Sequence, residues 1–438
     1  MDFSKSVLNS DYPDPSDDDS NSLSQNDVVE SPYRESSDPN FRTSAWSFRV
    51  CTTIPIAMAD DQNCCTKKRS QQCESKWSEL PIEIAELILE KLASIDILRF
   101  KAVCSSWKYA ANSYIAAPYY KPLPQSPWLV LGNGQEDNSC RFFSLEEKKV
   151  YTIKNILFEG CCVGSSHGWL VIMNKDSILN LFNPVSGESI QLSDIRALDG
   201  FSSFSSSEIL KAVLSSEPSG LNNFFLTICI RQTSRSMGSD NLAVYNHGDK
   251  TWSPLLASSR EIVFHNSKLF ALLGKYAVQV WDFKKSCGDR TTVYIFRRKL
   301  RNQSLTRTYM VKYSRLVESL GEILRVTLVL VNSLDDSSHK ESYFEVYKMN
   351  LRPTTSRGTW EKVESLGHRF IIWCRNRASI ALSASYFTEF EENSIYCYHR
   401  RRIFVCNLKD KVVKPCYRFD KSTTYKEPFW IVPNLSLK

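Results

Sequence analysis

The side chains of this sequence that are best suited to catalysis are its histidines, serines and cysteines. Their spacing does not match that of a catalytic or metal-binding site. None of the six histidines lies at metal-ligand spacing from another histidine. The nearest approach to a ligand pair is Cys397 and His399, which would share one face of a strand, as partly buried sheet residues also do. The sequence therefore predicts no metal, no cofactor and no catalytic residue at these positions.

Two glycine-containing runs are similar to active-site loops without matching one. The run GSSHG at 164–168 holds serine and histidine together, but Gly-x-Ser-x-Gly itself is absent, and a polar turn before Trp169 explains the run better. Gly160 and Gly164 flank two cysteines, yet no Lys-Ser or Lys-Thr follows, so no phosphate-binding loop is predicted. We expect a protein that is not an enzyme.

Arginines gather in two places, and the arginine side chain binds phosphate and carboxylate groups in a two-pronged geometry. The two clusters are Arg297, Arg298, Arg301 and Arg307, and Arg400, Arg401 and Arg402. One interpretation is a face that meets phosphate or an acidic peptide. The other is a set of exposed strand edges with no partner, and the sequence leaves both open.

The whole chain has the composition of a globular protein with an acidic N-terminal tail. Apolar residues make up 42% of 438 residues, and no apolar run reaches the length of a membrane span. Residues 1–45 carry a net charge of −7 against +14 for the rest. The tail at 1–75 is rich in Ser, Asp and Asn and is predicted to be disordered. Because it has no apolar segment typical of a secretory signal, the fourteen cysteines are expected to be reduced, and the expected location is the nucleus, the cytoplasm or both.

The segment from Trp77 to Trp107 has apolar residues at helical spacing. Pro81 suits the start of a first helix, the series continues through Leu92, and Ser94 to Asp96 indicate a break with a new N-cap. Two or three helices over 76–115 follow, with more apolar surface than so short a segment can bury on itself. Four prolines within 116–127 then predict a stiff linker.

The order and spacing of these residues resemble an F-box. The matching positions are Leu80, Pro81, Ile84, Leu87, Ile88, Leu92, Asp96, Ile97, Leu98, Val103, Cys104 and Trp107. The match departs from many F-boxes at Ala93-Ser94, where they carry a proline, which leaves the end of the first helix less sharply defined. An ordinary helical hairpin packed on its own domain is the alternative.

From residue 128 onward short β-rich runs alternate with turn residues, and we expect a mainly antiparallel all-β domain over 128–435. The clearest four-stranded unit has strands at 261–265, 268–273, 277–283 and 291–296. Similar units are predicted before it at 161–192 and 208–255 and after it at 309–363 and 370–416, the last with 395–398 as an extra strand. A further unit begins at 128–153, and the strand 429–432 is expected to complete it by pairing the two ends of the domain.

Repeats of this kind predict a β-propeller of about six blades, closed because an open array would leave edge strands exposed. This half is similar to the kelch-like domain of many plant F-box proteins. The paired glycines of a strict kelch repeat are missing, and the Trp-Asp rhythm of WD40 repeats is absent.

The resemblance implies the substrate-recognition subunit of a cullin–RING (SCF-type) ubiquitin ligase. The helices would dock on the ligase adaptor, and through it on cullin, using Leu80, Pro81, Ile84, Ile88, Leu92, Leu98, Val103, Cys104 and Trp107. The propeller would hold an unidentified target protein near a ubiquitin-charged enzyme. Two alternatives stay open, which are a scaffold outside any ligase and a propeller enzyme. Nucleic acid and membrane are not expected as partners, and the sequence does not reveal the target or the propeller face that binds it.

Overall fold

The computed structural model describes most of the chain beyond residue 75. The described residues are 76–121, 123–133, 140–153, 160–198, 208–218, 223–231, 241–274, 277–284, 291–296, 308–333, 340–375, 377–420 and 428–434. The acidic tail predicted to be disordered lies outside these residues, as does the arginine cluster at 297–307. None of the helices within the described ranges is long and apolar enough to span a membrane.

The N-terminal part is helical, as predicted. A short 3₁₀ helix (Lys76–Glu79) precedes α1 (Ile82–Leu89), α2 (Ser94–Lys101) and α3 (Ser105–Ala116). Pro81 comes immediately before α1, and its carbonyl accepts hydrogen bonds from Ile84 and Ala85. The three helices bury one small apolar core that includes Leu89, Phe100 and Ala111.

The start of α2 differs from the prediction. Ser94 was expected near the N-cap, but it is the first helical residue and is buried, and the N-cap residue Ala93 offers no side-chain oxygen. The free N–H of Ile95 instead donates to Oε1 of Gln125, at 3.1 Å. A residue of the proline-rich linker therefore satisfies this helix end, which a local capping rule does not anticipate.

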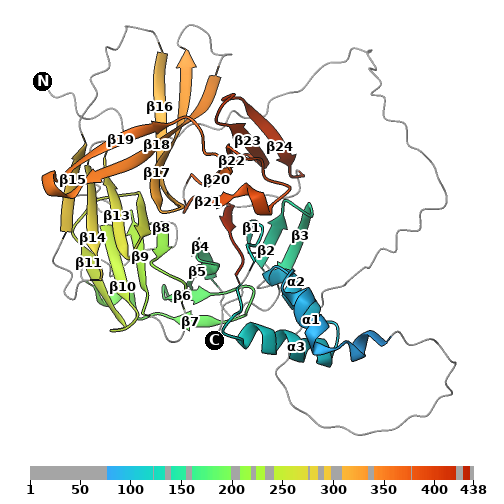
Figure 1. Ribbon diagram of the computed structural model, residues 1–438. Coiled ribbons are helices and arrows are strands. Elements are labelled where there is room, and N and C mark those ends of the chain that lie inside the picture. The colour runs from blue at the N-terminus through green and yellow to red at the C-terminus, as the bar shows by residue number, and fades with distance from the viewer. Residues whose placement is uncertain are drawn as a thin grey trace, which may run out of the picture. The chain divides into compact units, whose positions relative to one another are not determined.

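The rest of the described chain is β-structure in five hydrogen-bonded sheets (Figure 1). The four-stranded sheets are β25-β1-β2-β3 (Phe429–Ile431, Trp128–Asn133, Cys140–Ser144 and Lys149–Ile153), β4 to β7 (Gly160–Ser166, Trp169–Asn174, Leu179–Phe182 and Ser189–Gln191) and β8 to β11 (Ile209–Leu214, Phe225–Ile230, Asn241–Asn246 and Thr251–Leu255). Each is an antiparallel array at the positions that the sequence predicted.

One sheet has eight strands and arises from two predicted units. Its first half is β12 to β15 (Ile262–His265, Lys268–Leu273, Ala277–Asp282 and Thr291–Phe296), and its second half is β16 to β19 (Thr308–Ser319, Glu322–Ser333, Lys340–Arg352 and Arg357–Val363). The halves meet through a parallel pairing of only two residues on each side, between β15 and β19. Gly358 permits this approach, because a Cβ there would lie 2.4 Å from the Phe296 ring.

The last sheet corrects the predicted strand order. It contains β20 (Arg369–Trp373), β21 (Ile380–Ser383), β22 (Ser394–His399), β23 (Arg402–Asn407) and β24 (Val413–Arg418) in the order β21-β20-β22-β23-β24. The strand taken as extra, β22, lies at the centre and pairs in parallel with β20, while β21 occupies the edge. Parallel pairing needs a long connection, and here the connection from β20 to β22 contains β21. The 394–407 hairpin then lies beside β20.

Apolar cores connect the sheets into a closed ring. A separate core lies between each sheet and the next, another lies between the two halves of the eight-stranded sheet, and the last sheet shares a core with the first. The strand β25 adds to β1 in register from Trp128 opposite Ile431, so the end of the chain completes the sheet that the domain begins with. This is a β-propeller closed by its two ends.

Closure depends on Trp430, whose side chain is 1% exposed in the core between the last and first sheets. Replacing it with alanine is expected to cost about 3–5 kcal/mol of folding free energy, because a large cavity opens where the two ends meet. Chemical denaturation monitored by circular dichroism measures this loss. Val432→Ala, at a half-buried position two residues away, is the control and should cost much less. A stability for Trp430→Ala equal to that of the control contradicts the role of this closure.

Candidate functional site

The helical part carries an unusual share of exposed apolar side chains. Among the described residues, fifteen large hydrophobic side chains are exposed, and seven of these lie within 77–119. They include Trp77, Ile84, Leu87 and Val103, with 44% of Ile84, 57% of Leu87 and 51% of Val103 exposed. Exposed apolar patches of this kind mark interaction sites on soluble proteins.

The residues predicted to dock on an adaptor all reach the surface of the helices, and none is fully buried. Pro81, Ile84 and Val103 are exposed, and the half-buried members are Leu80, Ile88, Leu92, Leu98, Cys104 and Trp107. Of the half-buried side chains, all except Cys104 pack on the helical core with one side. Such residues can hold the helices together and still offer apolar surface to a partner, so docking by this set stays a prediction.

Trp107 connects the two ends of this helical surface. Its ring stacks on Phe100 with centroids 4.3 Å apart, and its Nε1 donates to the carbonyl of Trp77 at 2.8 Å. The backbone N–H of Leu80 also donates to this carbonyl, at 3.4 Å. The start of the helical part is thereby held against α3, and residues far apart in sequence contribute to one apolar surface.

Leu87 is an exposed residue of the helices that the predicted docking set omits. It was placed in the helical series, but the predicted docking set passes from Ile84 to Ile88. Leu87 lies three residues after Ile84, which brings the two side chains onto the same side of a helix, and both are exposed. We include Leu87 in the candidate surface, which we define as Leu80, Pro81, Ile84, Leu87, Ile88, Leu92, Leu98, Val103, Cys104 and Trp107.

Arg99 of α2 contacts the first propeller sheet. Its guanidinium donates to Asp96 of its own helix, to Glu147 at 2.9 Å and to the hydroxyl of Tyr151 at 3.1 Å. Partial burial opposes the charge of Glu147, but hydrogen bonds from Tyr151 and Arg99 outweigh it and lower the pKa of this carboxyl. Burial and the bond to Glu147 raise the pKa of Tyr151 to about 12. The group joins the helices to the β domain through polar contacts.

The serine and histidine residues of the GSSHG run at 164–168 have a structural role. His167 and Gly168 form the tight turn between β4 and β5, with φ of +51° and +80°. Ser165 is buried and its Oγ donates to the carbonyl of Trp430 at 2.6 Å, while Ser166 Oγ accepts the N–H of Leu214. Hydrogen bonds from the GSSHG run thus join the sheet β4 to β7 to β25 on one side and to β8 on the other. Throughout the described ranges, no group of three His, Cys, Asp or Glu side chains is arranged to hold a metal ion.

The cysteines within the described ranges are free thiols in this structure. Cys161 is exposed, whereas Cys374 is buried and its burial raises the pKa of the thiol to about 11. A raised pKa means a smaller thiolate fraction at pH 8, and only the thiolate is alkylated. Iodoacetamide should therefore modify Cys161 and spare Cys374 in the folded protein, as read by peptide mass spectrometry. Both should react after denaturation, and equal labelling in the native state would contradict this reasoning.

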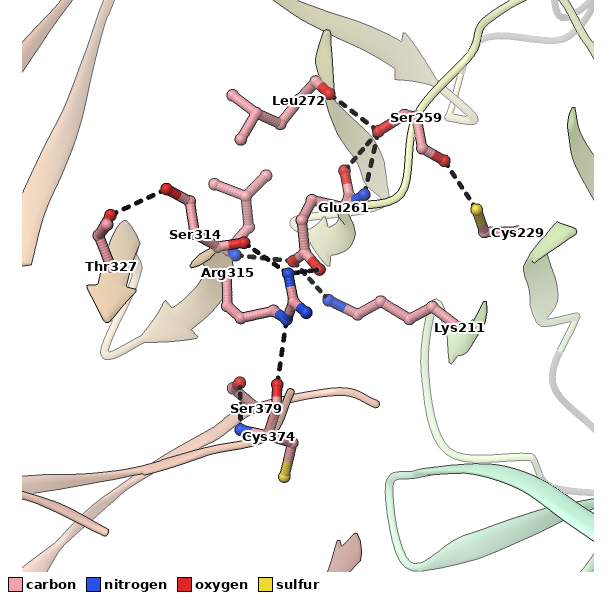
Figure 2. A network of polar contacts seen from close by, with 11 residues as sticks. Lys211, Cys229, Ser259, Glu261, Leu272, Ser314, Arg315, Thr327, Cys374 and Ser379 are labelled. Atoms are coloured by element: carbon pink, nitrogen blue, oxygen red, sulfur yellow. Dashed lines mark hydrogen bonds and ion pairs between the residues drawn. The ribbon is translucent and has the colours of Figure 1, made fainter. Parts of the chain in front are cut away.

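The propeller interior contains a buried ion-pair network at the centre of Figure 2. Lys211 of β8 lies 3.0 Å from Oε2 of Glu261, and Arg315 of β16 lies 3.2 Å from Oε1 of the same carboxylate. The backbone N–H of Leu316 also donates to Glu261, at 3.0 Å. Lys211 and Glu261 are almost entirely buried, so these charges depend on each other for stabilisation.

The same network reaches a fourth part of the ring. Nε of Arg315 donates to the carbonyl of Cys374 at 3.1 Å, immediately after β20. On the other side, the hydroxyl of Ser259 donates to the carbonyls of Glu261 and Leu272. The network therefore holds together four groups of strands, which gives it a structural role.

Comparisons with known proteins give a family match for the helical part and another for the β-propeller. The family model "F-box domain" matches residues 77–115, and the model "KIB1-4 beta-propeller" matches residues 142–418, more than half of the chain. The F-box/kelch-repeat protein KIB1 of Arabidopsis thaliana is 25% identical over 78% of this chain and 89% of its own length. The putative F-box protein At4g22660 of the same species is 22% identical over 83% and 98%.

A solved structure, that of YCF48 bound to D1 peptide, is 8% identical with a TM-score of 0.26 over 70% of this chain and 99% of its own. A similarity at this level carries no argument about function.

Proposed function

The chain belongs to the plant F-box proteins that carry a KIB1-4 β-propeller, and from this premise we propose that it is the substrate-recognition subunit of an SCF-type ubiquitin ligase. The helices bind an adaptor of the SKP1 type and, through it, cullin. The propeller binds a protein target and presents its lysines to a ubiquitin-charged enzyme. The chain itself makes and breaks no covalent bond, and its contribution is to raise the local concentration of the target.

The observation that carries this proposal is the exposed apolar surface of the helices. Ile84, Leu87 and Val103 stay exposed in the folded chain. Leaving large apolar groups in water costs free energy that a partner recovers on binding. The surface coincides with the segment that matches the F-box model, so the apolar patch and the family lead to the same partner.

For the propeller we infer six blades. The inner strands β25, β4, β8, β12, β16 and β21 contact one another in this order from β25 to β21. The eight-stranded sheet then contributes two blades, because its halves are joined by a pairing of only two residues. A ring of six separate cores between neighbouring blades supports the same number.

The direct test is a calorimetric titration of the purified protein with an SKP1-type adaptor. We expect one-to-one binding with a negative heat-capacity change, because apolar surface is buried. Co-purification of cullin with the adaptor-bound protein is the second expected result. A folded protein that binds no adaptor would rule out the proposed function.

A further inference from the structure

One end of the last propeller sheet is strongly basic. Three consecutive arginines, Arg400 to Arg402, occupy the β22–β23 turn and the start of β23, and Arg402 pairs across the sheet with Arg418 at the end of β24. The register also places Arg402 opposite His399. Arg375 follows β20 at the same end, because β20 runs parallel to β22. At one end of the sheet, each of the four adjacent strands β20, β22, β23 and β24 therefore has a basic residue at or next to its terminus.

These side chains are available for a partner. Arg375, Arg400 and Arg418 are exposed and Arg402 is half-buried. Across the described part of the chain, the structure gives none of the four an ion pair. Arg401 is left out of this set, since it already takes part in another contact, as does Asp420 after β24. We call Arg375, His399, Arg400, Arg402 and Arg418 the basic row.

Two contacts with Tyr313 position Arg375 within the row. Arg375 donates to the hydroxyl of Tyr313 at 3.3 Å, and its guanidinium lies 4.7 Å from the centre of the same ring. Partial burial and the neighbouring charges of Arg400 and Arg375 lower the pKa of His399. The imidazole is therefore neutral at pH 7, and the positive charge of the row comes from arginine.

The opposite end of the same sheet has a different character. Glu392 lies just before β22 and pairs with His368 at 2.9 Å, and Asp410 lies in the β23–β24 turn between Lys409 and Lys411. Charges of both signs alternate there. In the described part of the chain, by contrast, no carboxylate is paired with the arginines of the basic row, so their charge can attract an anion to this end of the sheet.

We propose that the basic row binds an extended acidic segment of the target protein, in which several Asp or Glu carboxylates meet successive arginines. The row crosses four strands, and neighbouring strands are about 4.8 Å apart, so it is roughly 14 Å long. A single phosphate spans one or two arginines, whereas an extended peptide places carboxylates along the whole row. Arginine forks suit carboxylates, since each can donate two parallel hydrogen bonds. The inference rests on the proposed function, because it names the class of target.

The probe is a fluorescein-labelled peptide of alternating Asp and Ser, titrated with the full-length protein and read by anisotropy. We expect saturable binding that weakens on the order of tenfold in Arg400→Glu/Arg418→Glu. The matched control is Lys409→Glu/Lys414→Glu, which makes the same change in net charge on the same sheet away from the row. Its affinity should stay within about twofold of the wild type.

Three results would overturn the proposal. They are the absence of peptide binding, equal weakening by both double variants, and tighter binding of either a singly phosphorylated Asn/Ser peptide or an oligouridylate RNA than of the acidic peptide. Adaptor binding is measured on the same samples. A wild-type circular dichroism spectrum and Tm of Arg400→Glu/Arg418→Glu show that the propeller of this variant is folded. If the wild type binds no adaptor, the ligase role is refuted, but the measured binding of the acidic peptide still stands.

Discussion

Ile84→Asp combined with Leu87→Asp is expected to abolish adaptor binding and leave the fold intact. Both side chains are about half exposed, so the free protein loses little packing. In a complex, two carboxylates would be buried in an apolar interface without partners, at a cost of about 4 kcal/mol or more. The affinity measured by calorimetry should then fall on the order of a thousandfold.

A matched control separates this effect from a general effect of charge. Leu256 and Leu320 are the two most exposed of the large hydrophobic side chains in the described part, and both lie in turns of the propeller. Leu256→Asp with Leu320→Asp makes the same change in charge and should bind the adaptor within about twofold of the wild type. Undiminished binding by the Ile84/Leu87 variant, with a native circular dichroism spectrum, would place the adaptor contact elsewhere.

Glu261→Ala is expected to be the most destabilising single substitution of a charged residue in the propeller. It leaves the ammonium of Lys211, the guanidinium of Arg315 and the N–H of Leu316 without their shared acceptor. Removing one member of a buried ion pair costs about 3–5 kcal/mol, because the remaining charges stay in a poorly solvating interior. Thermal unfolding should show a Tm lower by roughly 10 °C.

The origin of this loss can be tested with a second variant. Glu261→Gln should also destabilise the protein, and adding Lys211→Met should restore part of the stability, since it removes the unpaired ammonium. The exposed pair Lys362–Glu364 is the control, with atoms 2.6 Å apart at the surface. Glu364→Ala should leave Tm unchanged within error, because solvent screens this pair. A Tm for Glu261→Ala equal to that of this control would mean that the network contributes little.

The local elements could be predicted from the sequence alone. The helical spacing of Ile84, Leu87 and Ile88 predicts α1, although the helix ends at Leu89 and not at Leu92 as the series suggested. Alternating apolar runs between turn residues predict nearly every strand. These patterns depend on neighbours one to four residues apart, which the sequence lists in order. The strand at 429–432 was also predicted to close the ring, because a propeller otherwise leaves unpaired edges. The structure confirms that the two ends of the domain pair.

The tertiary structure determines which residues far apart in the sequence come into contact. It placed β22 beside β20, capped α2 with Gln125, and joined β15 to β19 over Gly358. None of these has a local signal, because each depends on packing between segments far apart in the chain. Propensity and periodicity describe one element at a time.

The candidate sites follow the same division. The F-box segment could be predicted because it is one contiguous stretch of sequence, whereas the exposure of Leu87 needed the structure. Docking by its residues stays a prediction. The Lys211–Glu261–Arg315 network was not predictable as a site, because its members come from separate strands. For the same reason the sequence pointed to Arg400 and Arg402 of the basic row but not to Arg375 or Arg418. A charged residue in a strand looks the same in sequence whether it faces water or a partner 50 residues away. Only the closed ring of sheets brings these charges together, since burial and register across strands are properties of the whole fold.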